Sequence, residues 1–231
     1  MVKWEDELGG RIENFVAKSK EKIANVTAQN LIETNAINPF LVAALGMELK
    51  TVARFYVYQR IQRGIVTSFG ADMEFIVKGI AGGKRGEWWD VVTEYEGMTY
   101  YISVKSGPSD MDKDQVEHFA DRATKEMKKD KSAYPIIGMG YGRSLWPIIG
   151  TTLKNKGLSP EKHAIFGKRL YEILTKDPNG HKKILTIIKE AEKKILGKKT
   201  ITDLIEEKVE EIAKEFQKKY RTVGDLIDDT F

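Results

Sequence analysis

The chain has 231 residues, 41% of them hydrophobic and 31% charged, and it contains no cysteine. This length suits one large domain or a core with a helical addition, and the composition is that of a folded globular protein. The lack of cysteine excludes a disulfide framework, a cysteine-ligated zinc or iron–sulfur site and a thiol nucleophile. No run approaches the ~20 apolar residues that cross a bilayer, and the charged start of the chain has no signal core, so we expect a cytoplasmic protein with no membrane partner.

The formal net charge of +4 is unevenly distributed. Residues 1–150 carry 20 basic and 20 acidic side chains, residues 151–200 carry 13 and 5, and residues 201–231 carry 5 and 9. The basic middle block is compatible with a polyanionic partner, and a lysine-rich solvated helix face explains it equally well.

The first third of the chain shows helical periodicity. Apolar residues recur at three- and four-residue spacing over 4–25, 39–63 and 69–80, and we expect three helices there. Asn38-Pro39 caps and begins the second of these helices, and Gly64 is expected to end it.

The period then changes from that of a helix to that of a strand. Residues 87–95 and 98–106 are rich in β-branched and aromatic side chains and are separated by Glu96-Gly97, which predicts an antiparallel hairpin. After it we expect a helix, a buried strand, a strand or packing loop, and three further helices: 112–129, 134–139, 145–150, 160–176, 179–196 and 201–220. The predicted fold class is α/β, with a small mixed sheet flanked by helices and a helical C-terminal extension.

Three side chains of suitable chemistry converge in this pattern. Asp90 and Lys105 lie on opposite arms of the hairpin, so antiparallel pairing places them within reach of each other. Glu74, on the preceding helix, can supply a second carboxylate. Carboxylates are hard oxygen ligands for Mg²⁺, and a nearby ammonium group can steady an attacking water or the charge on a phosphorus centre. The set fits Mg²⁺-dependent phosphodiester hydrolysis, with Mn²⁺ able to substitute.

The surrounding stretch resembles the PD-(D/E)xK nuclease core, and within it the PmeII-like and related type II restriction endonucleases. The resemblance spans roughly residues 40–190 and is strongest over 86–119. The matching features are Gly70-x3-Glu74, Trp89-Asp90-Val91, Ser103-Val104-Lys105-Ser106-Gly107-Pro108, Asp114-Gln115, Leu170-Tyr171-Glu172-Ile173-Leu174 and Asp177-Pro178.

The resemblance implies roles for the site residues. Asp90 would be the central metal ligand, Lys105 the catalytic lysine, and Glu74 a helix carboxylate that binds or orients a water of the metal. Ser103 departs from the family pattern, because the middle acidic residue of (D/E)xK is expected at that position. Some relatives with a serine there recruit a carboxylate from the following helix, which points to Glu117 in this chain.

Two further groups are candidates for the same centre. The Val104 carbonyl could reach the metal. Gln115 is a catalytic candidate, although Asp112-Lys-Asp-Gln also fits a helix capping box, in which Gln115 would have a structural role.

Contacts to DNA are expected around this centre. Lys84 and Arg85 precede the hairpin and can hold phosphates. Ser106 and Ser109 can donate hydrogen bonds to oxygens of the DNA backbone. Arg143 follows the buried strand and can either reach a guanine edge or form a surface ion pair.

The leading interpretation is a type II restriction endonuclease that cuts duplex DNA at a short specific site as a homodimer, with a cognate DNA methyltransferase as its genetic partner. Residues 1–150 would form N-terminal helices and the nuclease core, and residues 151–231 a helical extension packed on the same domain for DNA binding or dimerisation. The amphipathic helix over 201–220 is one candidate for the dimer interface. The alternatives are a structure-specific repair or junction nuclease and a non-catalytic DNA-binding protein on a nuclease fold.

Overall fold

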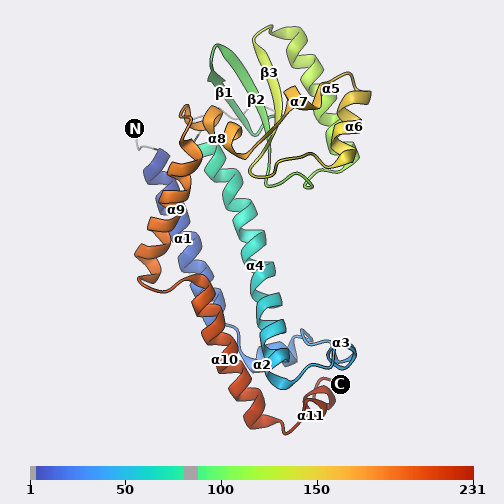
Figure 1. The fold of residues 1–231 in the computed structure, drawn as a ribbon, viewed down its shortest axis with the longest axis vertical. Coiled ribbons are helices and arrows are strands. Elements are labelled where there is room, and N and C mark those ends of the chain that lie inside the picture. Colours follow the sequence, from blue (N-terminus) through green and yellow to red (C-terminus); the bar gives the residue numbers. More distant parts are fainter. Residues whose placement is uncertain (1–3, 81–87) are drawn as a thin grey trace. The chain divides into compact units, whose positions relative to one another are not determined.

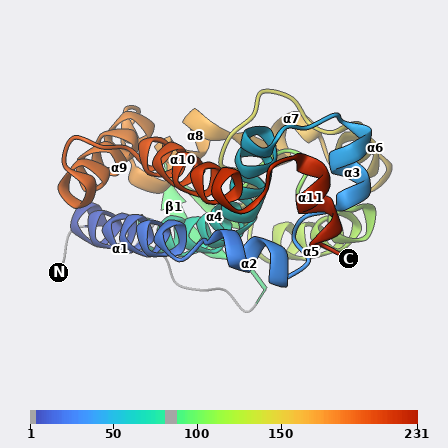
Figure 2. The same cartoon turned by 90° about the horizontal axis from the view of Figure 1, so that it is seen from below.

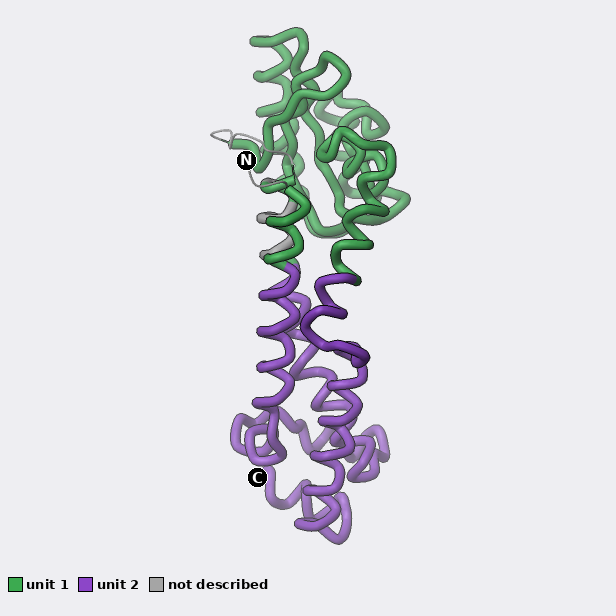
Figure 3. The backbone as a smooth tube through the Cα atoms, turned by 90° about the vertical axis from the view of Figure 1, so that its left-hand side faces the viewer, with its two compact units in different colours: residues 1–11, 70–189 green, residues 12–69, 190–231 purple. Residues whose placement is uncertain are grey.

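The computed structural model describes residues 4–80 and 88–231, without the side chains of residues 71–76 and 78. The chain forms two compact units, each built from non-contiguous stretches (Figure 3). Unit 1 holds residues 1–11 and 70–189, and unit 2 holds residues 12–69 and 190–231. The sequence suggested a division near residue 150, whereas the last third of the chain contributes to both units.

A β-hairpin forms one edge of the sheet in unit 1 (Figure 1). Strand β1 (Val91–Tyr95) pairs antiparallel with β2 (Met98–Lys105), as the sequence predicted. The turn residues Glu96 and Gly97 have φ values of 50° and 77°. Positive φ at both positions is the requirement of a two-residue type I′ turn, which explains the short Glu-Gly connection.

Two parallel strands complete a four-stranded mixed sheet in the order β1-β2-β3-β4. Strand β3 (Ala133–Met139) pairs with β2, and the short β4 (Ala164–Phe166) pairs with β3. Strand β3 is apolar and almost wholly buried, which confirms the predicted central strand. The mixed sheet flanked by helices confirms the predicted α/β class.

Each face of β3 has its own helical partners. Ile137 and Met139 belong to one buried cluster with Val116 and Phe119 of helix α5 (Lys113–Lys129). Side chains alternate along a strand, so position 138 faces the opposite side. There a Cβ on Gly138 would lie 2.7 Å from Leu170 Cδ1 of helix α8 (Gly167–Thr175), and glycine is what allows this close approach.

Two predicted segments in unit 1 have a different structure. Residues 145–150, expected as a strand or loop, lead into helix α6 (Pro147–Asn155). The helix expected over 160–176 is divided into α7 (Pro160–His163), β4 and α8. Pairing with β3 explains the interruption. Ala164, Ile165 and Phe166 form a fourth strand beside β3 instead of continuing the helix.

Unit 2 is helical in the part of the chain that the structure describes. Helices α2 (Ala28–Glu33), α3 (Pro39–Ala44), α10 (Ile201–Lys219) and α11 (Val223–Asp228) lie wholly within it, while α1 (Trp4–Ala24), α4 (Leu49–Ile80) and α9 (Gly180–Leu196) run on into unit 1. Seen from below, α3 and α11 lie side by side (Figure 2). None of the described helices has both the length and the apolar character needed to cross a membrane.

The boundaries of the early helices differ from the prediction. The helix expected over 39–63 ends at Ala44, because Gly46 adopts a left-handed conformation with φ 58° after the Leu45 cap. Helix α4 then continues through Gly64 and includes the helix expected over 69–80. A glycine inside a helix costs only about 1 kcal/mol relative to alanine, which the packing of a 32-residue helix offsets.

The core of unit 2 is formed between α4 and α10. Tyr56 and Val57 of α4 are buried in one cluster with Val209, Ile212 and Phe216 of α10. The apolar face of the helix predicted over 201–220 therefore packs inside its own unit. That face covers the core of unit 2, and a role of this helix in dimerisation stays a prediction.

Candidate active site

The end of strand β2 carries the candidate lysine. Ser103 and Lys105 pair in register with Ile137 and Met139 of β3, so both side chains belong to the same face of the sheet. Beyond the strand, the Gly140 N–H donates to the Lys105 carbonyl at 2.9 Å. This bond ties the Lys105 backbone to Gly140, the residue that follows β3. The partly buried lysine is thus positioned by the end of the central strand β2.

Asp90 lies immediately before β1, next to the same strand end. Its own N–H donates to the Ile102 carbonyl at 3.0 Å, and its carboxylate Oδ2 accepts the Val104 N–H at 2.9 Å. The carboxylate is thereby held at the backbone of the residue that precedes Lys105. Asp90 is therefore bound to the residue next to Lys105, across the predicted hairpin, and the catalytic roles of both residues stay a prediction.

A small pocket of about 170 Å³ opens at this strand end. Its lining includes Val104, Lys105, Ser106 and Gly140 from the ends of β2 and β3, and Asp110 from the loop that follows β2. One positively charged group, one negatively charged group and backbone polar atoms therefore surround a space large enough for a hydrated ion or a phosphate oxygen.

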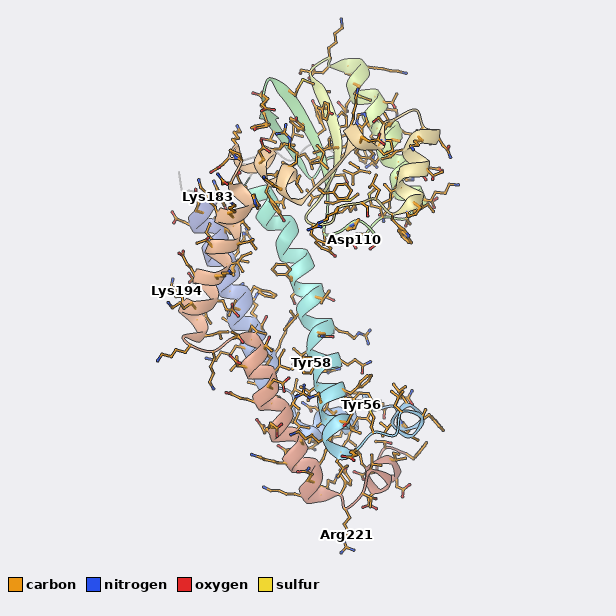
Figure 4. All side chains as sticks on the ribbon, viewed as in Figure 1. Tyr56, Tyr58, Asp110, Lys183, Lys194 and Arg221 are labelled. Carbon is orange, nitrogen blue, oxygen red and sulfur yellow. The ribbon has the colours of Figure 1, made fainter. Side chains whose placement is uncertain are left out.

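Asp110 is the acidic residue in this pocket that sequence reasoning missed (Figure 4). Its Oδ2 accepts the Gly107 N–H at 2.8 Å, so the Ser-Gly-Pro-Ser-Asp loop folds back toward Lys105. Gly107 lies close to the Tyr141 ring, because a Cβ at this position would lie 2.6 Å from it. The signal in the sequence was the Gly-Pro-Ser-Asp turn itself, because an aspartate in such a turn bonds to nearby backbone amides.

The helix that carries Glu74 also borders the pocket. Gly70 and Val77 of α4 are among its lining residues. Position 74 is four residues after Gly70 and three before Val77, so it lies on the same helix face. The Glu74 side chain itself lies outside the described residues.

The remaining catalytic candidates are less close to this pocket. Gln115 is exposed, and its backbone N–H donates to the Asp112 carboxylate at 2.8 Å, which is the N-cap bond of α5. Glu117 forms an ion pair with Lys113, one turn earlier on α5, at 3.6 Å. Neither of the two is among the described residues that line the pocket, whereas Val104 is. Asp90 is not a lining residue either, but its carboxylate is bound to the Val104 N–H.

The structure describes three of the five predicted DNA contacts, and their role in DNA binding stays a prediction. Ser106 is exposed and lines the pocket, and Ser109 is exposed in the same loop. Arg143 is exposed in the loop after β3. Lys84 and Arg85 lie outside the described residues.

A partly buried tyrosine, Tyr171, lies next to Gly140 of the pocket lining. The Tyr171 hydroxyl would be 3.3 Å from a Cβ on Gly140. Burial raises the pKa of Tyr171 to about 12, so its phenol is a weaker acid than an exposed tyrosine.

Oxygen donors lie in and beside the pocket: Asp110 and Val104 line it, and Asp90 is bound to the Val104 N–H at its side. No group of three or more acidic, histidine or cysteine side chains with metal-binding spacing occurs among the described residues. Asp90, Asp110 and the Val104 carbonyl are hard oxygen donors, which suit Mg²⁺ with several of its waters retained. The donor set therefore fits a magnesium ion better than zinc.

The four-stranded mixed sheet flanked by helices, with Asp90 and Lys105 at its strand ends, defines a restriction-endonuclease-like protein. The family model for the type II restriction endonuclease EcoO109I matches residues 5–195, and the chain belongs to this family. Membership implies a restriction nuclease that acts on DNA. The PmeII-like relationship suggested by the sequence is not the one found. Among curated proteins, none matches the chain.

Proposed function

We propose that the protein is a Mg²⁺-dependent type II restriction endonuclease of the PD-(D/E)xK kind, which hydrolyses phosphodiester bonds of duplex DNA at a short specific site. The observation that carries this proposal is the Asp90 carboxylate bound to the Val104 N–H, one residue before Lys105. The Asp90 carboxylate is held at Val104, and the ammonium group belongs to the next residue, Lys105. The two groups can therefore act on one phosphate together.

In this proposal the carboxylates of Asp90 and Asp110 and the Val104 carbonyl hold the metal, with Glu74 contributing from α4. Bound there, Mg²⁺ would polarise the phosphoryl oxygen and make a water more acidic. The Val104 N–H fixes which oxygen of Asp90 is free, because Oδ2 is already engaged as an acceptor. Lys105 donates hydrogen bonds to the attacking water or to the charge that develops on the phosphate.

Two such centres can cut both strands of a short site in one binding event. A two-fold site is most simply recognised by a two-fold dimer, and we propose a homodimer as the active form. A restriction enzyme that works in the cytoplasm also needs a methyltransferase of matching specificity to protect the host DNA. We expect its gene beside the gene for this chain.

The test is separate substitution of Asp90→Ala and Lys105→Ala. Each should lower the rate of DNA cleavage in Mg²⁺ by at least on the order of 100-fold, because each removes a group that acts on the reacting phosphate. DNA binding, measured by fluorescence anisotropy, should stay close to that of the unmodified protein. Cleavage is measured as discrete bands from plasmid or phage DNA.

Lys131→Ala and Asp114→Ala serve as controls, because both side chains are exposed and lie outside the pocket lining. Both control variants should cut normally. Full cleavage by either Asp90→Ala or Lys105→Ala would refute the assignment. Cleavage restricted to branched substrates would instead support a junction nuclease, and binding without cleavage in Mg²⁺ or Mn²⁺ would support a non-catalytic role.

A further inference from the structure

Unit 2 contains a polar groove of about 750 Å³ that is separate from the pocket at Lys105. Its lining includes Lys22 of α1, the α2–α3 turn at Asn35, and Gln59, Arg60 and Arg63 of α4. Hydroxyl groups complete it, and no acidic side chain is among the described residues around it. A groove lined by cations, amides and hydroxyls presents hydrogen-bond donors to an anion from several sides.

The walls of this groove are a hydrogen-bonded helix cap on one side and a helix on the other. The Ala36 N–H donates to the Leu31 carbonyl at 3.2 Å, and the Asn35 N–H donates to the Ile32 carbonyl at 3.1 Å. With φ 51° at Asn35, these bonds form a Schellman cap at the end of α2. The opposite wall is a single helix, since Tyr56, Arg60 and Arg63 follow one another at helical spacing along α4.

The basic residues of α4 fall into two groups, one paired with glutamates of α10 and one facing the groove. Lys50 and Arg54 form ion pairs with Glu210 and Glu206 of α10, at 2.7 Å and 2.6 Å. Arg60 and Arg63 are exposed in the groove and have no ion-pair partner within the part of the chain that the structure describes. The α10 glutamates thus cancel the first two cations of α4, and the next two remain available to an external anion.

Lys22 adds a third cation whose position is fixed. Its Nζ donates one hydrogen bond to Ser68 Oγ at 2.6 Å and a second to the Gly64 carbonyl at 3.4 Å. An ammonium group has three donors, so one remains for a ligand. The three cations therefore lie on one polar surface and are held by two different helices.

We propose that this groove binds the phosphate backbone of duplex DNA, as a contact outside the cleavage centre. This inference rests on the proposed function, because it takes the anion in the groove to be the DNA substrate. Lys22, Arg60 and Arg63 are placed to neutralise backbone phosphates, and the neighbouring amides and hydroxyls donate to phosphate oxygens without reading base sequence. The groove volume far exceeds that of a single phosphate ion, which favours a polymer.

Neutralising phosphates releases condensed counterions, so the contact has a measurable salt dependence. For B-DNA the slope of log K against log salt changes by about 0.9 for each phosphate neutralised. Loss of two arginine contacts should therefore make the slope less steep by about 1.8, and should weaken binding on the order of tenfold at low salt.

The experiment measures binding of a fluorescent 30-base-pair duplex of arbitrary sequence over a KCl series, in EDTA so that no cleavage occurs. Arg60→Ala with Arg63→Ala is compared with Lys218→Ala combined with Arg221→Ala. The control pair removes the same charge from the same unit at exposed positions outside the groove, with Arg221 just beyond the end of α10 (Figure 4). Only the groove variant should show the shallower slope and the weaker binding.

A groove variant with the slope of the unmodified protein, or a control pair that loses as much as the groove variant, would overturn the proposal. Arg60→Lys with Arg63→Lys guards against misfolding, because it keeps both charges; it should retain the salt slope. A steep loss of affinity in this lysine variant would show that the guanidinium groups read base edges, and would replace the phosphate assignment. Failure of the unmodified protein to bind DNA at all would instead refute the proposed function.

Discussion

At the scale of single residues, the open question at the active site is which carboxylate compensates for Ser103. Ser103 shares its sheet face with Lys105, so an acidic residue there would point to the same side. Glu117 is paired with Lys113, whereas Asp110 lines the pocket together with Lys105. Only one Asp110 oxygen is used by Gly107, which leaves the other for a ligand. These contacts favour Asp110 over Glu117.

Asp110→Asn tests this assignment. An asparagine side chain can still accept the Gly107 N–H, so the loop should keep its shape while the carboxylate charge is lost. We expect Mn²⁺ affinity, measured by calorimetry in the absence of DNA, to fall on the order of tenfold, and cleavage to require more Mg²⁺.

Asp112→Asn is the matched control, because asparagine is as good an N-cap as aspartate and the position is two residues away. Ser103→Glu in the Asp110→Asn background should restore metal affinity, since it returns a carboxylate to the usual place on β2. Unchanged Mn²⁺ binding by Asp110→Asn would show that Asp110 only closes the loop.

The same residues show how far a sequence determines such a site. Asp90 and Lys105 could be placed because a hairpin fixes which residues face one another across two adjacent strands. Asp110 could not, because its approach depends on a loop that folds back under Tyr141, and loop geometry leaves no periodic signal. Glu117 was a candidate because the resemblance implies a carboxylate from the following helix, but its actual contacts depend on the neighbouring Lys113.

At the scale of elements, the periodicity of the sequence fails to predict a helix or strand where strand pairing or helix packing determines it. Long regular segments such as α1, α5 and α10 were predicted within a residue or two, because each has an amphipathic pattern of its own. The three-residue strand β4 could not be predicted, since only its partner β3 makes it a strand. Helix α4 was expected to end at Gly64, and packing carries it past that glycine.

Gly138→Ala tests the contact between the sheet and α8. The added Cβ would lie 2.7 Å from Leu170 and 2.8 Å from Ile102, and both side chains are fully buried, so neither can move away easily. We expect a loss of about 1–3 kcal/mol in the free energy of unfolding, measured by urea denaturation.

Gly150→Ala, in α6 of the same unit, is the control. A Cβ there meets nothing within 4 Å, and alanine is favoured over glycine in a helix, so this variant should gain about 0.5–1 kcal/mol. Equal stability of the two variants would mean that α8 does not pack against β3 as closely as described.

At the scale of the whole molecule, the division into two units was not visible in the sequence. Each unit combines distant stretches of chain, and three long helices take part in both units. No change of composition marks the places where α1, α4 and α9 pass from one unit to the other. The charge segregation along the chain likewise does not follow the units, because the basic block of 151–200 is shared between them.

The proposed homodimer has a candidate surface in unit 2, the aromatic pair of Phe40 and Phe231. Their ring centroids lie 5.7 Å apart in an edge-to-face arrangement, although the two residues are 73% and 81% exposed. Phe40 belongs to α3 and Phe231 follows α11, and these two helices lie side by side. Large exposed aromatic groups in contact are typical of protein–protein interfaces. A second copy of the chain is the occupant we propose, because a second Asp90–Lys105 centre can cut the other DNA strand in the same binding event.

Phe40→Ser should therefore weaken self-association at least on the order of tenfold, measured by sedimentation velocity over a range of protein concentrations. The fold should be unaffected, since the side chain is not part of the buried core. Val66→Ser, at a residue of the same unit that is 69% exposed, removes a comparable apolar group elsewhere and should leave association unchanged. A dimer of equal strength in Phe40→Ser would place the interface on another surface, and a monomer that cuts both strands at one site would remove the argument for a two-fold enzyme.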